Sequence, residues 1–154
     1  MIKDVRNRIH AILDTIPEIK TVPPRIPSGV QKFELPMAFA RHTGTTMPQP
    51  ESSDTQLLQL TFQISLFVAE VNLGLRAENE DVSYDIVTQI YQKFLTSQQL
   101  QDPTTRTGLT SVRYTLLTGD GGLRAPIPYP DGQGIREFYG YQINVRVDYE
   151  QYCY

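Results

Sequence analysis

Two long stretches of the chain alternate between apolar and polar residues at every second position. The first covers 57–70 (LLQLTFQISLFVAE) and the second covers 138–150 (FYGYQINVRVDYE). This alternation predicts two β-strands, each with one face on a core. Either strand would run roughly 43–46 Å at about 3.3 Å per residue, whereas a compact chain of this size is only about 40 Å across. The strands therefore either bend sharply or project beyond the body of the fold.

The alternation also assigns the two faces of each strand. On the first strand, the core face is predicted to carry Leu58, Leu60, Phe62, Ile64, Leu66 and Val68. On the second strand, it is predicted to carry Tyr139, Tyr141, Ile143, Val145, Val147 and Tyr149. The other face of the first strand is polar and uncharged, and consists of Gln59, Thr61, Gln63 and Ser65. A freely solvated strand normally carries some Lys or Glu against unwanted pairing, so this face is either covered by its own chain or packed against another copy.

Apolar residues three and four positions apart predict two amphipathic helices. The first covers 1–16 and is ended by Pro17, because proline disfavours helical conformation in the residue before it. The second covers about 79–97. Carboxylates at the start of a helix complement the positive end of its dipole. Here those carboxylates are Glu78, Glu80 and Asp81.

Two shorter strands are expected at 35–40 and at about 109–118. Extended loops are expected at 23–34, 42–54 and 119–137, and the last of these opens with five glycines and three prolines within sixteen residues. Strands that alternate with segregated helices predict an α+β fold, with a small, largely antiparallel sheet packed by two helices. At 154 residues the chain is expected to form a single domain.

Composition excludes several functional classes. The net charge of −3 argues against electrostatic binding of nucleic acid, because such binding requires a basic stripe on the protein. No apolar run approaches the roughly 20 residues of a membrane span, so no membrane association is expected. The one cysteine, Cys153, allows neither an internal disulfide nor a cysteine zinc site. Folding in a reducing cytoplasm is the simplest interpretation.

The residue types that support catalysis do not occur in catalytic patterns. Neither His10 nor His42 has a second ligand at metal-binding spacing, and no G-x-S-x-G motif occurs. The glycines of 119–122 (GDGG) precede prolines rather than a Lys-Ser/Thr pair and a helix, which indicates a turn rather than a phosphate site. We expect no catalytic residue, no cofactor and no metal. A small α+β enzyme or ligand-binding domain stays an alternative, but it needs a pocket with converging polar groups.

Features typical of interfaces are better represented. Seven of the nine tyrosines lie at or after Tyr114, and tyrosine is enriched in protein interfaces. Arg124 and Arg136 are expected to pair with acidic groups across an interface. The candidate interface residues are Gln59, Thr61, Gln63 and Ser65 of the strand face, Arg41 and His42 at the mouth of the 42–54 loop, the arginines Arg124 and Arg136, and the tyrosines outside the core pattern, Tyr129, Tyr152 and Tyr154.

The order of elements is accompanied by local sequence similarity. The helix leads into ILDTIPEIKTV at 12–22, and LPMAFA at 35–40 is followed by TFQISLFVAEVNLG at 61–74 and by the closing FYGYQINVRVDYE strand. Over nearly its whole length, the chain resembles the tail-terminator (tail-completion, minor tail or neck) proteins of long-tailed bacteriophages. The resemblance implies a ring, usually of six copies, that caps the tail tube, stops its elongation and joins the tail to the head connector.

The same resemblance implies the partners and the location. The partners would be further copies of the chain, the tail tube protein and the head–tail connector or stopper protein, and genomic DNA would pass through the lumen without specific binding. The protein would lie in the tail or neck region of the virion after assembly in the host cytoplasm. A head-completion or stopper protein, which forms the adjacent ring, is the alternative.

Overall fold

The computed structural model describes residues 1–31, 34–47, 55–71, 77–131 and 134–152. The elements, in chain order, are α1 (Ile2–Leu13), β1 (Met37–Thr46), β2 (Thr55–Glu70), α2 (Ala77–Thr96), β3 (Val112–Asp120), β4 (Arg124–Asp131) and β5 (Gly134–Tyr152). In this described part the strands form one antiparallel, five-stranded sheet in the order β1-β2-β5-β3, and β4 pairs with the first part of β5. The predicted α+β class, with a small antiparallel sheet and two helices, is confirmed.

Two of the predicted loops contain strands, and those predictions are wrong. β1 continues through Thr46, so the start of the 42–54 loop pairs with β2; the rest of that loop, from 48, lies outside the described residues. Most of the 119–137 loop is a hairpin formed by β4 and the start of β5. Its prolines are compatible with a strand because β4 pairs on one side only, and proline is tolerated at the edge of a sheet. The first helix also ends earlier than predicted, at Leu13.

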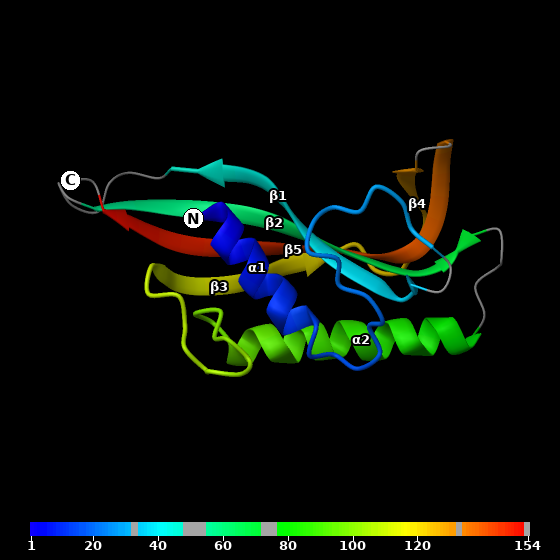
Figure 1. The fold of residues 1–154 in the computed structure, drawn as a ribbon, viewed down its shortest axis with the longest axis horizontal. Helices are drawn as coiled ribbons and strands as arrows, with labels where there is room; N and C mark the ends of the chain where they lie inside the picture. The colour runs from blue at the N-terminus through cyan, green and yellow to red at the C-terminus, as the bar shows by residue number, and fades with distance from the viewer. Residues whose placement is uncertain (32–33, 48–54, 72–76, 132–133, 153–154) are drawn as a thin grey trace.

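The main core lies between one face of the sheet and the two helices (Figure 1). The core face predicted for β2 is correct, since all six of its side chains are buried. On β5 the side chains of Tyr141, Ile143, Val145 and Val147 are buried, while Tyr139 and Tyr149 are half-buried. The helices complete this core with Val5, Ile9, Ile12 and Leu13 of α1 and Ile86, Ile90 and Phe94 of α2.

A second, smaller core lies on the opposite face of the sheet, near the β4–β5 hairpin. It consists of Val30, Leu35, Met37, Phe39, Phe67, Ile127 and Phe138. The rings of Phe67 and Phe138 stack with their centroids 4.8 Å apart. Phe67 continues the polar face of β2 beyond Ser65, so this core covers only one end of that face.

The excess length of the strands is accommodated both by a bend and by projection. β5 has 19 residues and would extend about 60 Å if straight. Figure 1 shows its first part curving away beside β4, while its last residues and the start of β2 extend past the helices. The register shifts between Phe67 and Ala69, where β2 faces Gly140 and Tyr139 of β5. A bulge of this kind bends a strand and increases its twist.

Gly140 allows the two long strands to approach closely at this bulge. A Cβ atom built on Gly140 would lie 1.8 Å from the carbonyl oxygen of Leu66. We therefore expect Gly140→Ala to lower the free energy of unfolding by roughly 3 kcal/mol, because backbone on both strands has to move apart. Urea denaturation measures the change.

The matched control for this substitution is Gly44→Ala in β1. A Cβ atom on Gly44 would meet no atom within 4 Å. Its unfolding free energy should stay within about 1 kcal/mol of the parent value. Equal losses in the two variants would contradict the assignment of the bend to close approach at Gly140.

His10 connects α1 to the edge strand β1. Its ring is 7% exposed, and its Nε2 atom accepts a hydrogen bond of 2.8 Å from the backbone N–H of Ala40. On β1, two residues before Ala40, the N–H of Ala38 donates to the carbonyl oxygen of Thr21 at 3.1 Å. These contacts satisfy outward-facing donors of an edge strand. Burial, aided by the positive charge of Arg6, lowers the pKa of His10 below its ordinary value of 6.5.

The lowered pKa of His10 predicts a loss of stability in mild acid. Below about pH 6.5 the unfolded chain binds a proton at His10 that the folded chain excludes, so this contribution is present above that pH and is lost as the pH falls toward the folded pKa. The dependence is at most about 1.4 kcal/mol per pH unit for one proton. Urea midpoints at about pH 7.5 and about pH 5.5 should differ more for the parent than for His10→Gln.

The other histidine provides the control for this pH dependence. His42 is half-buried and its ring lies 5.4 Å from that of Phe62. If the pH dependence falls in His10→Gln and not in His42→Gln, it belongs to His10. A His10→Gln variant that loses as much stability in acid as the parent would show that other groups cause the effect.

Candidate functional interface

The face of the sheet opposite the two helices forms a continuous polar surface, which we call the open face. Its β2 residues are the predicted Gln59, Thr61 and Gln63, which are half-buried, and Ser65, which is 9% exposed. The register places Asp148, Arg146, Asn144 and Gln142 of β5 beside them, in that order. The second core covers the end near Ser65, whereas neither α1 nor α2 packs on this face. The structure thus leaves most of the predicted face uncovered by the described part of the chain.

Two ion pairs form between side chains on the open face. Arg146 Nε lies 3.2 Å from Asp148 Oδ1 on β5, and Arg113 Nε of β3 lies 3.4 Å from Glu150 Oε2 of β5. Sequence alternation alone indicated an uncharged strand, but the neighbouring strand brings charged residues beside it. The surface is therefore polar with local ion pairs rather than charge-free.

A groove of about 330 Å³ lies where the open face meets the second core, and we call it the sheet-face groove. Its apolar wall includes Phe39, Phe67, Ile127 and Tyr129, and its polar floor includes Arg41, Gln63, Ser65 and Gln142. Four strands (β1, β2, β4 and β5) and the segment before β1 contribute to it. The groove combines aromatic surface with hydrogen-bonding groups, which is the mixed character of protein interfaces.

The predicted arginines at this groove differ in their surroundings. The guanidinium of Arg41 is exposed and forms no ion pair or hydrogen bond with the residues that the structure describes. Arg124 is exposed, and its Nη1 atom donates a hydrogen bond of 3.2 Å to Gln142 Oε1 at the groove. His42 lies apart from them, since its ring contacts Phe62 of the main core and its Nε2 atom lies 2.8 Å from Thr45 Oγ1.

Arg136 pairs within its own chain, contrary to the expectation that it pairs across an interface. Its Nε and Nη2 atoms each lie 2.9 Å from a carboxylate oxygen of Glu70, and its Nη1 atom donates to the carbonyl oxygen of Val30. The guanidinium also lies 5.2 Å from the ring centroid of Phe138. Such a bidentate pair fixes geometry as well as charge. Arg136 therefore holds the β4–β5 hairpin onto β2.

Tyr129 also contacts its own chain. Its hydroxyl donates to the carbonyl oxygen of Pro27, and its ring meets those of Phe39 and Phe67 at 6.0 and 5.5 Å in edge-to-face arrangements. Burial raises the pKa of its hydroxyl. The tyrosine is half-buried, so it closes one wall of the groove rather than standing free for a partner.

The last two predicted tyrosines lie at the C-terminal end. Tyr152 is the last residue of β5 and is paired in register with Thr55, at the end of the sheet that extends past the helices in Figure 1. Tyr154 lies outside the described residues. The structure therefore places Gln63, Ser65, Arg41 and Tyr129 in the lining of one groove, and Arg124 donates to its floor residue Gln142.

The described residues provide no arrangement suited to metal binding. No group of three or more His, Cys, Asp or Glu side chains lies close enough among them to hold a metal ion. A hollow of about 470 Å³ between the ends of α1 and α2 includes Asp102, but this carboxylate accepts the N–H groups of Thr104 and Thr105 at 2.8 and 3.0 Å. It shapes a turn that Arg8 holds to α1 through the carbonyl oxygens of Leu100 and Thr107.

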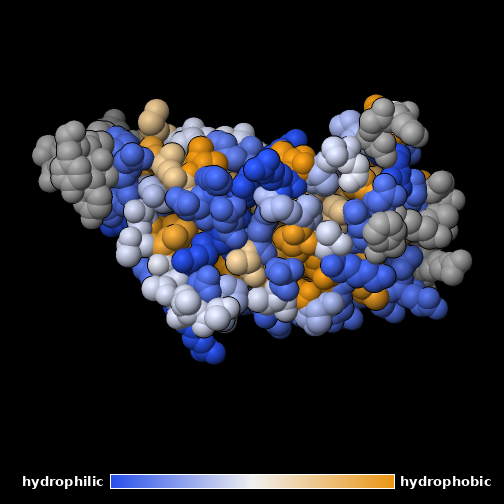
Figure 2. Space-filling model, viewed as in Figure 1, coloured by the Kyte–Doolittle hydropathy of each residue, from blue (hydrophilic) through white to orange (hydrophobic). Residues whose placement is uncertain are grey.

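The helix-covered side of the molecule has a surface of mixed polarity. In Figure 2 its apolar residues form separate patches between hydrophilic ones. None of the helices in the described part of the chain is long and apolar enough to cross a membrane. Among the residues that the structure describes, this view shows no single large apolar patch of the kind that marks an obligate hydrophobic interface.

Comparisons with known proteins do not extend these observations. No protein-family model matches the chain, and no curated protein matches it. Function is therefore inferred from the open face, the groove and the extended end of the sheet.

Proposed function

We propose that the protein is a tail terminator of a long-tailed bacteriophage. In this role, copies of the chain form a ring, with six as the expected number, which caps the tail tube, stops its elongation and joins the tail to the head connector. The observation that carries the proposal is the open face: a wide polar sheet surface, over which the described part of the chain places no helix. The sequence resemblance to tail terminators is its second support.

The open face has the properties of a contact between subunits of a ring. Its amide and hydroxyl groups can form hydrogen bonds with a partner. The charges of Arg146 and Asp148, and of Arg113 and Glu150, are already paired within the sheet. A ring requires a heterologous contact, in which one surface of a subunit binds a different surface of the next. A polar surface of this kind also keeps the free subunit in solution before assembly.

The extended end of the sheet suits contact between rings. The paired ends of β2 and β5, near Thr55 and Tyr152, extend past the helices in Figure 1. A ring of such subunits presents these strand ends to a neighbouring ring along the tail axis, either the tail tube or the head connector. The net charge of −3 favours a lumen through which DNA slides, because clustered basic groups would retain it.

In this role the protein acts without catalysis, cofactor or metal. Its partners are other copies of itself, the tail tube protein and the connector or stopper protein, and its place is the tail or neck of the virion. A stopper protein in the adjacent ring uses the same kind of surface, since it also needs contacts around a ring and along its axis. The partner that the ring binds distinguishes the two roles.

Microscopy of the assembled protein tests the proposal. Light scattering and negative-stain images are recorded for the protein alone, with tail tubes and with filled heads. Rings that bind tube ends, or monomers that become rings only there, support a terminator. Rings that bind filled heads and ignore tubes support the stopper role instead. A monomer that ignores both contradicts the proposed function.

A charge placed on the open face should block assembly. In Gln63→Lys, a longer, cationic side chain on β2 would stand beside Arg41. It would occupy space that the next subunit fills and would repel Arg41, so we expect ring association to weaken at least about tenfold. The monomer should fold as the parent does, because this face is open to solvent before assembly. Analytical ultracentrifugation and circular dichroism measure the two properties.

Gln98→Lys is the matched control, since Gln98 is an exposed glutamine beyond α2 and lies away from the open face. It should form rings as readily as the parent. If Gln63→Lys does so as well, the assignment of the open face to the ring interface is wrong.

A further inference from the structure

Helix α2 carries the excess negative charge of the chain. Its four carboxylates and one lysine give it a net charge of −3, which equals the formal net charge of the whole protein. Glu78, Asp81 and Asp85 are exposed, and we call these three residues the acidic surface. Glu80 is half-buried and accepts a hydrogen bond from the hydroxyl of Tyr84 at 2.7 Å.

The helix dipole explains only part of this charge. Carboxylates in the first turn complement the positive end of a helix, but the effect falls off within that turn. Asp85 lies about two turns after Ala77, where the helix begins. Tyr84, 44% exposed, stands between Asp81 and Asp85 and adds an aromatic ring to the same region. Capping of the helix explains neither the charge of Asp85 nor the exposed ring of Tyr84.

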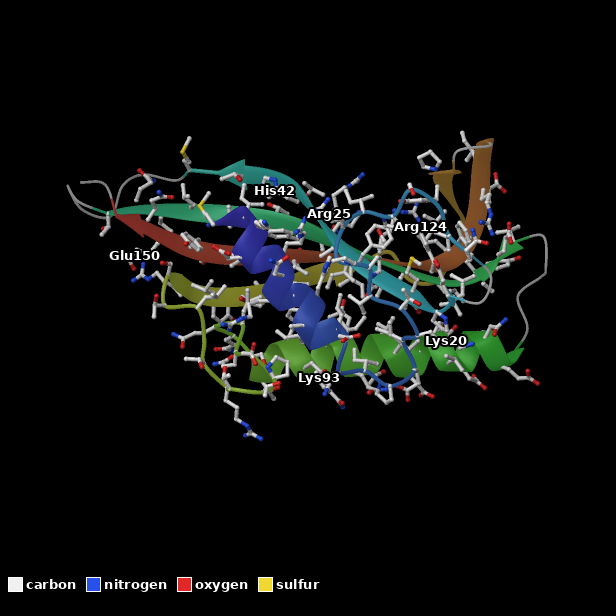
Figure 3. All side chains as sticks on the ribbon, viewed as in Figure 1. Lys20, Arg25, His42, Lys93, Arg124 and Glu150 are labelled. Atoms are coloured by element: carbon white, nitrogen blue, oxygen red, sulfur yellow. The ribbon has the colours of Figure 1, made fainter. Side chains whose placement is uncertain are left out.

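The sheet-face groove has the complementary character. The described residues that line it include Arg41 and no carboxylate, and exposed Arg124 donates to the floor residue Gln142. Arg25, which is exposed, directly precedes Ile26 of the groove wall. Figure 3 shows Arg25 and Arg124 above α2, with Lys93 on the helix below them. The groove therefore joins positive charge to aromatic surface, as the acidic surface joins negative charge to Tyr84.

We propose that the sheet-face groove of one copy binds the acidic surface of the next copy. This inference rests on the proposed function, because it specifies the contact that forms the ring. The groove lies on the open face, and α2 packs on the opposite face of the sheet. The two surfaces of one molecule cannot meet each other, but those of two copies can do so head to tail. A repeated contact of this type closes into a ring when its rotation allows closure.

Charge reversal tests the pairing. The parent should associate in about 0.05 M salt and weaken as salt rises to about 0.5 M, because salt screens exposed charges. We expect Arg41→Glu and Asp85→Arg each to weaken association at least about tenfold, because each places like charges together across the contact. Sedimentation velocity measures the association, and thermal unfolding verifies the fold of each variant.

Restoration is the decisive measurement. The double variant Arg41→Glu/Asp85→Arg should associate within about threefold of the parent, because every contact again joins opposite charges. An equimolar mixture of the two single variants should also associate, through alternating parental and reversed contacts. Lys3→Glu on α1 is the control, since Lys3 is exposed and lies on neither surface, and it should associate as the parent does.

The outcomes separate this inference from the proposed function. Three results would each overturn the pairing of the groove with the acidic surface. They are association of Arg41→Glu at parental strength, failure of the double variant to recover, and a parent that stays monomeric in low salt. Rings on tube ends together with any of these results leave the terminator role intact with another interface. Charge-swapped recovery without binding to tubes or heads supports the pairing and contradicts the phage role.

Discussion

The antiparallel pairing of β2 with β5 is the constraint on which the rest of the structure depends. It runs from Thr55 beside Tyr152 to Glu70 beside Phe138. β1 and β3 add to its two sides, the helices pack on one face, and the second core forms where it bends. A slip of one residue would exchange the two faces of a strand, placing Leu60 or Phe62 on the open face. The register that buries the core therefore also produces the open face.

The sequence was sufficient for the features that depend on local periodicity. Alternation in β2 identified its buried face because a half-buried strand repeats every two residues. The four-residue spacing of Val82, Ile86, Ile90 and Phe94 predicts the buried side of α2; the last three are buried and Val82 is half-buried. The sequence does not show whether the polar face around Gln63 is covered, because this depends on where β4 and the segment before β1 pack.

The features that the sequence missed depend on contacts between distant residues. Arg136 and Glu70 are 66 positions apart, so no local pattern indicates that they pair. Tyr129 lies in a segment of alternating prolines, which resembles a loop until β5 is present to pair with it. Gly140 is a further case: glycine in a strand can mark a bulge or a close approach of backbone, but only the opposing Leu66 carbonyl shows which strand comes close.

The proposed contact also accounts for the separation of charge and core within one small sheet. Apolar surfaces large enough to hold a ring together would make free subunits associate without control. A contact built from amides, hydroxyls and complementary charges gives orientation and specificity more than affinity. Subunits that bind one another weakly would then assemble most readily where a tube end holds several of them together, since tethering raises their effective concentration. Under the proposed function, such weak contacts would favour ring closure at a tube end over ring closure in solution.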